Sequence, residues 1–327
     1  MRVGVFLFIL CCLAVVAPAL VAAQQDQQAP PPAATPTPPQ GLPEDVVTPN
    51  TPKPKPKINN LPFNMYGLTG LMVTTATRTL KPGSFEVGLG GSWEDSLQPA
   101  YYRRELAFLG TVGMPAGFEF GLRVPYVMTD LVTIPRFNAL GTLVNTYGRS
   151  ATAGVGSVEG MFKWGFVEQK QFLPAFAVGL GGIAPGTSYS RQLGYVKYYG
   201  AKVLLAMGLE VNDLPYTDYA FAILADGELV LRDMGVDNRN YEEKHGMVHG
   251  GMVFPLMPRN FLQLNLEYEG VLMLGTNNNQ DTNAILGTLR FVLDHFSGTA
   301  GAKYTFKSDP DFGDTLSWVA TASYTYF

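Results

Sequence analysis

The sequence predicts an all-β protein: a transmembrane antiparallel up-and-down β-barrel of about twelve strands, preceded by a disordered Pro-rich segment. Three observations predict it, namely a series of alternating apolar and polar segments from residue 84 to 327, an export signal before them, and an aromatic chain end. In one such segment, Phe118 and Phe120 flank Glu119. A period of two places the two kinds of residue on opposite faces of a strand. Many such segments, apolar on one face and ionised on the other, are typical of barrels that cross a membrane.

Residues 1–23 have the layout of a secretory signal peptide. They carry one charge, Arg2, followed by an apolar stretch over 3–16 and then small residues. The alternative is a retained membrane anchor, but the apolar stretch is short for spanning a bilayer. Both cysteines, Cys11 and Cys12, lie inside this segment. We therefore expect the mature chain to offer neither a disulfide nor a thiolate metal ligand.

Composition narrows the class further. Charged residues make up 15% of the chain, whereas they make up about a quarter of a typical soluble domain. After the signal no window approaches about twenty apolar residues, which excludes a helical inner-membrane protein. The net charge of −4 argues against nucleic acid as a partner.

Residues 24–60 form a Pro/Gln/Lys-rich tether. The tether ends in a run of alternating Pro and Lys over 52–57. Proline removes the amide donor and fixes φ, so we expect an extended, disordered segment without a core. Its simplest role is a spacer in the periplasm. The alternative is a docking segment for the cell wall or for an envelope protein.

Residues 61–83 form a Gly- and Thr-rich lead-in to the barrel. The stretch from Gly67 to Gly83 resembles the opening of YjbH-like outer-membrane proteins that are linked to exopolysaccharide. Those proteins typically read Gly-Leu-x-Gly-Leu, then Pro-Thr-Ala, then a Gly before the first strand. Here Thr75-Ala76-Thr77 stands where the proline-containing triplet would be. The resemblance implies an outer-membrane barrel with a role in the envelope or in exopolysaccharide biogenesis.

Residues 84–327 contain the barrel. We expect strands near 84–93, 102–113, 117–127, 153–165, 172–183, 198–210, 218–231, 246–255, 261–272, 284–294, 299–306 and 315–327. Twelve is an even number, as bacterial single-chain barrels require, although ten to fourteen strands remain open. Short connections such as 114–116 alternate with long ones such as 128–152. The short turns and both barrel ends then lie on one side, the periplasm.

The chain ends with Tyr324, Tyr326 and Phe327. This terminus resembles the aromatic-bearing last strand by which the barrel-assembly machinery recognises Gram-negative outer-membrane β-barrel proteins. The lipid-facing alternation ends at Tyr326, which leaves Phe327 as an extra residue beyond the strand. The resemblance implies a location in the Gram-negative outer membrane, with membrane lipid and the assembly machinery as partners.

The polar face of the predicted strands lines the interior. The candidate lumen-lining residues are Glu86, Glu119, Arg123, Glu159, Lys163, Lys202, Asp226, Glu228, Arg232, Glu267, Glu269, Arg290 and Lys303. One interpretation is a packed interior of paired charges. The other is a hydrated path whose excess of acidic groups favours cations or neutral polar solutes. On the second interpretation Glu267 and Glu269, about 7 Å apart on one strand face, repel unless a base such as Arg290 lies between them.

Small inward residues on one predicted strand are the place where free space is expected. Ala175, Ala177, Gly179 and Gly181 all fall on the polar face of the strand at 172–183. Short side chains leave room beside that wall, although a twelve-stranded barrel lies between the filled and the water-holding sizes.

No catalytic, cofactor-binding or metal site is expected. His245 and His249 are four apart, roughly 13 Å on a strand, which is too far for one metal. His295 and Ser297 are similar to the His-x-Ser-Asn-Gly motif of outer-membrane phospholipase A, but Gly298 replaces the Asn. A turn explains that composition.

The expected function is therefore a non-enzymatic channel or transport component for small polar or amphipathic solutes. The alternative is a structural or accessory barrel in cell-envelope or exopolysaccharide biogenesis. An outer-membrane lipase-type enzyme is a distant third.

Overall fold

The computed structural model describes residues 63–96, 101–137, 143–170, 173–186, 199–211, 221–236, 239–257, 261–274, 282–293, 295–307 and 315–327. The predicted signal peptide and Pro-rich tether lie outside the described residues. The chain divides into two units. The first, Met1–Lys55 with Lys170–Leu173, is described only at its second segment, where Lys170 and Leu173 form an isolated bridge. The second, Pro56–Gln169 with Pro174–Phe327, contains the barrel.

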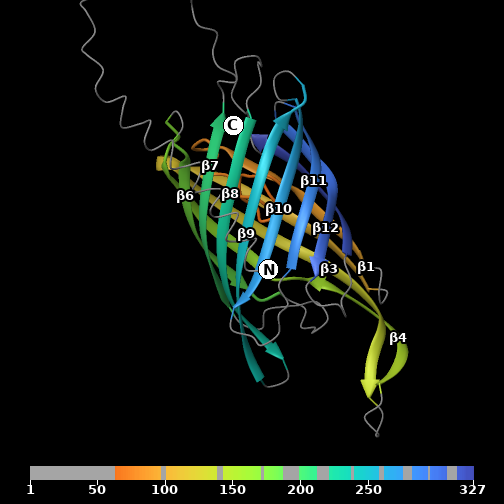
Figure 1. Cartoon of the computed structure of the whole chain (residues 1–327). Helices are drawn as coiled ribbons and strands as arrows, with labels where there is room; N and C mark the ends of the chain where they lie inside the picture. Colours follow the sequence, from red (N-terminus) through yellow and green to blue (C-terminus); the bar gives the residue numbers. More distant parts are fainter. Residues whose placement is uncertain are drawn as a thin grey trace, which may run out of the picture. The chain divides into compact units, whose positions relative to one another are not determined.

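Within the described ranges, thirteen strands form one antiparallel sheet (Figure 1). They are β1 (Phe85–Ser96), β2 (Tyr101–Met114), β3 (Phe118–Phe137), β4 (Leu143–Val155), β5 (Val158–Val167), β6 (Ala175–Ala184), β7 (Gly200–Val211), β8 (Phe221–Val236), β9 (Arg239–Pro255), β10 (Leu262–Leu274), β11 (Thr282–Leu293), β12 (Phe296–Lys307) and β13 (Thr315–Tyr326). Strand β1 pairs with β13 along its whole length, which closes twelve of the strands into a barrel. The predicted up-and-down barrel is confirmed.

Strand β4 is the extra strand. The first part of β3 pairs with β5 over Phe118–Arg123, and the second part pairs with β4 from Tyr126 to Phe137. The prediction of an open connection over 128–152 was therefore wrong, because this stretch continues β3 as a two-stranded ribbon beyond the barrel. Pro135 is tolerated there because the described pairing of β3 with β2 ends at Leu131, so among the described residues β3 has a neighbour at Pro135 on one edge only. Strands β8 and β9 likewise extend into the connection expected at 232–245.

The turn between β2 and β3 is the 3-10 turn η2 (Pro115–Gly117), with positive φ at Ala116 and Gly117. In the part of the chain that the structure describes, no helix is long and apolar enough to cross a membrane. The connections β2–β3, β5–β6, β7–β8, β9–β10 and β11–β12 lie at one end of the barrel, together with the start of β1 and the end of β13. We call this the short-turn end. Tyr326 is the last residue of β13, and Phe327 follows it as predicted.

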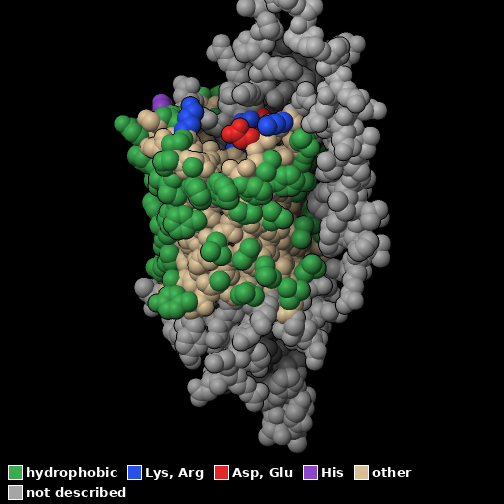
Figure 2. Space-filling model, turned by 90° about the vertical axis from the view of Figure 1, so that its left-hand side faces the viewer, with side chains coloured by type: hydrophobic (Ala, Val, Ile, Leu, Met, Phe, Trp, Pro, Cys, Tyr) green, Lys and Arg blue, Asp and Glu red, His purple; other side chains and the backbone are tan. Residues whose placement is uncertain are grey.

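The outer face of the barrel is apolar. Leu180 is 65% exposed, Trp318 56% and Phe162 55%, while their neighbours along the strands point inward. Apolar side chains cover the face seen in Figure 2, and charged ones gather at one rim. Near the short-turn end, aromatic rings of adjacent strands stack, as Phe85 does with Tyr326 at 5.1 Å between centroids. Bilayer-spanning barrels carry such an apolar band with aromatic residues at its borders.

The lead-in folds back inside the barrel (orange in Figure 1). We call residues 63–80 the plug. Its apolar side chains are almost fully buried against inward-facing residues of different strands. Phe63 packs on Ala107 and Leu109 of β2, and Leu68 packs on Met161 of β5 and Leu204 of β7. The plug thus fills the part of the interior that the wall side chains of a twelve-stranded barrel leave open.

Candidate functional site: the plug and the barrel wall

The plug is shaped by local hydrogen bonds rather than by regular structure. The side-chain oxygen of Asn64 accepts bonds from the amides of Tyr66 and Leu68, both at 3.0 Å, and its amide donates to Thr75 Oγ1 at 3.0 Å. Isolated bridges join Phe63 to Thr69 and Gly70 to Thr75. Asn side chains commonly organise turns in this way. Asn64 therefore connects the two ends of a compact double loop.

Two glycines of the Gly-Leu-x-Gly-Leu motif are required by close approach. Gly67 has φ +75°, and a Cβ there would lie 2.5 Å from the carbonyl oxygen of Leu122 on β3. A Cβ at Gly70 would lie 2.2 Å from the carbonyl oxygen of Thr74. Only glycine, which has no Cβ, allows both close approaches and the positive φ at Gly67 without strain. The motif thus has a physical role here, since it lets the plug backbone lie against the wall and against itself.

Glu267 of β10 holds the loop Gly70–Thr75. Its Oε1 accepts the amide of Met72, and its Oε2 accepts the amides of Val73 and Thr74, all at 2.9 Å. The Thr74 hydroxyl donates to the same Oε2 at 3.0 Å. Successive backbone N–H groups that converge in this way form an anion-binding concavity. A carboxylate of the wall thus fills an anion site made by the plug.

Lys163 of β5 and Glu119 of β3 form a second attachment. Both side chains are fully buried, and Lys163 Nζ lies 2.9 Å from Glu119 Oε1. Lys163 also donates to the carbonyl oxygens of Ala76 at 3.1 Å and Arg78 at 2.7 Å. Glu119 in turn accepts the amide and hydroxyl of Thr69 at 2.9 and 2.6 Å. One ion pair therefore binds two separate segments of the plug.

Two further wall residues bind plug main chain. Asp226 of β8 accepts the amide of Thr75 at 2.5 Å and pairs with His249 Nδ1 of β9 at 2.6 Å. Arg290 of β11 donates to the carbonyl oxygen of Gly70 at 3.0 Å. Together with Glu119, Lys163 and Glu267, these residues bind the plug from β3, β5, β8, β10 and β11.

A second set of inward-facing wall residues forms ion pairs farther from the short-turn end, and we call this set the belt. Arg123 bridges Glu105 and Glu159, and Lys202 bridges Glu159 at 2.6 Å and Glu228 at 3.0 Å. Ionised groups that are removed from water in this way need partners, and here they have them. A separate pair joins Lys303 to Glu269 at 2.6 Å.

Tyr66, at the inner edge of the plug, meets this belt. Its ring lies 5.1 Å from Lys202 Nζ and 6.0 Å from the His249 ring. Burial and the nearby Glu269 raise the pKa of the Tyr66 phenol, so the ring remains neutral.

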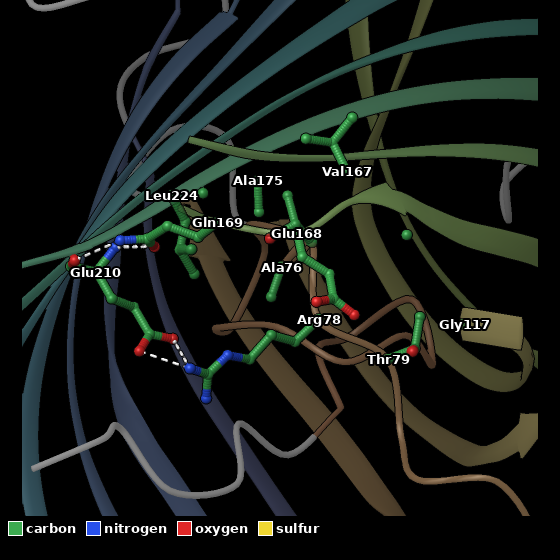
Figure 3. A pocket seen from close by; sticks show the side chains of 13 residues that line it. Ala76, Arg78, Thr79, Gly117, Val167, Glu168, Gln169, Ala175, Glu210 and Leu224 are labelled. Carbon is green, nitrogen blue, oxygen red and sulfur yellow. Dashed lines mark hydrogen bonds and ion pairs between the residues drawn. The ribbon is translucent and has the colours of Figure 1, made fainter. Parts of the chain in front are cut away.

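A cavity of about 460 Å³ lies between the plug and the wall at the short-turn end (Figure 3). It is lined by plug residues 76–79 and by parts of β5 to β8 together with the β2–β3 and β5–β6 turns. Arg78 pairs with Glu210 at 2.6 Å, and Figure 3 shows Glu168 reaching toward the plug segment that carries Arg78. The wall here presents Gly165, Ala175 and Gly208. The cavity exists because these inward positions lack large side chains.

The predicted free space beside β6 is thus present, although only in part. Ala175 lines the cavity. Ala177 is fully buried, and positions Gly179 and Gly181 lie against Leu204 and Met161 instead.

The candidate lumen-lining residues point inward wherever their side chains are described, and the structure divides them into three groups. Glu119, Lys163, Asp226, Glu267 and Arg290 bind the plug; Arg123, Glu159, Lys202 and Glu228 form the belt; Glu269 and Lys303 pair with each other. Glu86 is also buried, beside the plug. The side chain of Arg232 lies outside the described residues.

Arg290, named in the sequence analysis as a base that could separate Glu267 and Glu269, does not lie between them. In the register of β10 and β11 it faces Gln263, on the short-turn side of both glutamates. Instead, plug amides bind Glu267, and Lys303 pairs with Glu269. Asn64 and Thr74 were missed by the sequence analysis, because their roles depend on bonds that form only in the folded plug, those of Asn64 to the amides of Tyr66 and Leu68 and that of Thr74 to Glu267.

The histidines take structural partners. His295 Nδ1–H donates to the carbonyl oxygen of Thr325 at 2.9 Å, and Ser297 Oγ lies 2.6 Å from Ser323 Oγ. Both residues of the lipase-like pair are thus bonded to β13. Among the residues that the structure places, no group of three or more His, Cys, Asp or Glu is arranged to hold a metal.

No protein-family model and no curated protein matches the sequence. Solved structures of barrels do match. The COG4313 outer membrane channel from Pseudomonas putida F1 has a TM-score of 0.49 at 12% identity, covering 76% of this chain and 98% of that one. The NanC porin has a TM-score of 0.45 at 7% identity, covering 73% and 98%. The beta domain of the Bordetella autotransporter BrkA has a TM-score of 0.44 at 14% identity, covering 75% and 100%.

Proposed function

We propose that the protein is a non-enzymatic channel or transport component of the Gram-negative outer membrane for small polar or amphipathic solutes. The observation that supports this most is the way in which the interior is closed. The plug occupies the interior, and ionised side chains of the wall bind its main chain. A cavity of about 460 Å³ remains beside one wall. Hydrogen bonds of this kind can be exchanged for bonds to water when a segment moves.

The apolar outer face supports the membrane location, because an outward apolar band on a closed barrel is typical of a surface that contacts lipid. The start of β1 and the end of β13 share the short-turn end, and the plug also leads into β1 there. We propose that this end faces the periplasm, where the tether over 24–60 meets the cell wall or an envelope protein. The barrel-assembly machinery would insert the chain.

Planar-bilayer recording on the purified full-length protein tests this function. We expect discrete conductance steps of low open probability, because the plug closes most of the interior. Heat-modifiable migration in SDS and fractionation with outer membranes establish that the protein used is the folded barrel. A folded barrel that stays silent at every voltage and salt concentration, including after removal of residues 63–80, would contradict a channel.

A structural or accessory barrel in envelope or exopolysaccharide biogenesis is the second candidate. It is favoured by the dense packing of Phe63, Leu68 and Leu71, each at most 1% exposed, and by the resemblance over Gly67–Gly83. Deletion of the gene separates the two candidates. Altered surface polysaccharide without changed solute uptake supports the accessory role. Lipase assays with a Ser297→Ala control test the third possibility, an outer-membrane lipase-type enzyme.

A further inference from the structure

The loop Gly70–Thr75 is a complete binding site for a planar two-oxygen anion. Three consecutive amides and one hydroxyl meet the two oxygens of Glu267, one on Oε1 and three on Oε2. The site is buried, since Met72 is 1%, Thr74 0% and Glu267 3% exposed. Charge-assisted bonds from main-chain amides are among the stronger hydrogen bonds in proteins.

Glu267 differs from the other wall carboxylates that bind the plug. Glu119 is paired with Lys163, and Asp226 is paired with His249. In the described part of the chain, no basic side chain lies within ion-pair distance of Glu267. Its charge is therefore balanced by the plug donors together with the longer-range attraction of Arg290 on β11, and the free energy of the contact depends in part on the loop remaining in place.

We propose that the loop Gly70–Thr75 is a carboxylate-binding site, that Glu267 fills it to latch the plug in the closed barrel, and that a soluble carboxylate can occupy it in place of Glu267. The binding site stands on geometry alone, whereas its role as a latch rests on the proposed channel function. Carboxylate-bearing solutes are the class of ligand that the site selects, because the donors are spaced for two oxygens in one plane.

The latch is connected to the cavity by the chain itself. Thr75 is followed by residues 76–79, which line the cavity. At Thr77 the plug contacts the wall at Gly208, which has no side chain. A Cβ built on Gly208 would lie 2.8 Å from Thr77 Oγ1. Release of the loop therefore removes one of the attachments of the plug segment that faces the open space, while the bonds of Asp226 to Thr75 and of Lys163 to Ala76 and Arg78 remain to be exchanged. Movement of this segment away from β7 would widen the cavity toward the interior.

Chemical rescue tests the binding site. Glu267→Ala removes the carboxylate, and we expect a lower midpoint of heat-modifiable unfolding for the full-length protein in detergent. Sodium acetate or formate should raise that midpoint, whereas sodium chloride at equal ionic strength should not. Leu286→Ala is the matched control, because Leu286 faces Glu267 across β10 and β11, is fully buried and carries no charge.

Acetate that stabilises Leu286→Ala as much as Glu267→Ala, or stabilises neither, would overturn the site. If Glu267→Ala does not assemble, Glu267→Gln supplies the same test. The amide keeps the shape of the side chain but retains one acceptor oxygen, so we expect an intermediate midpoint. Glu267→Gln with the midpoint of the parent would equally contradict the site.

A disulfide tests the latch. Glu267→Gln should raise the open probability in bilayers about tenfold, within the usual range of coupling energies, whereas Glu269→Gln, on the same face of β10, should not. Thr77→Cys together with Gly208→Cys places two thiols close enough for a bridge. In the Glu267→Gln background, the oxidised bridge should abolish opening and a reductant should restore it. Channel opening that persists while the disulfide is oxidised would refute the latch.

A different outcome separates the latch from the channel function on which it rests. If no variant conducts but acetate still rescues Glu267→Ala, the channel function is refuted and the carboxylate site is retained.

Discussion

Glu267 and Glu269 point into the barrel from the same face of β10, two residues apart, but among the described hydrogen bonds only Glu267 accepts plug amides. Glu267 is bound by plug amides, whereas Glu269 is paired with Lys303 of β12 at 2.6 Å. Two side chains that the sequence makes equivalent therefore have different partners. The difference arises from a segment almost two hundred residues earlier in the chain, whose amides donate to Glu267.

Replacement of Lys163 by Met should destabilise the folded barrel strongly. The variant leaves Glu119 and three plug carbonyl oxygens, those of Thr69, Ala76 and Arg78, without their buried donor. Breaking a buried ion pair on one side costs about 3–5 kcal/mol. Urea unfolding in lipid vesicles measures the loss. A second change, Glu119→Gln, should recover part of it, and Lys163→Met without effect would show that the pair contributes no stability.

Replacement of Gly67 by Ala should loosen the plug while the barrel remains assembled. The new methyl group would clash with the carbonyl oxygen of Leu122, at a backbone conformation that alanine rarely adopts. We expect faster cleavage of residues 63–80 by protease added to the detergent-solubilised barrel. Gly246→Ala is the control, because a Cβ there meets nothing within 4 Å. Equal cleavage rates for the two variants would contradict the assigned role of Gly67.

Replacement of Leu180 by Arg should impair membrane insertion. Leu180 is 65% exposed in the middle of β6, where the outer face is apolar. A charge facing lipid near the bilayer centre costs about 2–4 kcal/mol. The folded fraction in SDS migration after refolding into vesicles should fall, whereas Leu180→Ala should refold like the parent. Undiminished folding of the Arg variant would mean that this face does not contact lipid.

The strands could be predicted because their signal is local. Ten residues of alternation suffice to define a strand and its faces, and the ends of β7, predicted at 198 and 210, are observed at Gly200 and Val211. The ribbon of β3 and β4 could not be predicted, since Pro135 is usual in loops and the pairing depends on β5 covering only the first part of β3.

The plug could not be predicted either. Its residues show no alternation, and its attachments join positions far apart, such as Val73 with Glu267. The sequence showed which wall residues are charged and face inward. It did not show which of them bind main chain, because main-chain donors carry no sequence signal.

Selectivity for cations remains a prediction, and the structure identifies acidic residues that would produce it. Acidic side chains outnumber basic ones among the inward positions, and Glu168 and Glu210 border the cavity with Arg78. A path through this cavity should therefore favour cations, and added salt should weaken the preference by screening. Glu168→Gln should lower the cation-to-anion permeability ratio in reversal-potential measurements across a salt gradient.

Glu269→Gln extends this test to the interior. It leaves the charge of Lys303 without its partner, so it should lower the same permeability ratio if ions pass this part of the wall. Glu267→Gln should instead change the frequency of opening, because this carboxylate is covered by the plug in the closed state. Anion preference in the parent, or a ratio that neither Glu168→Gln nor Glu269→Gln alters, would remove these two residues from conduction and leave them with a role in packing.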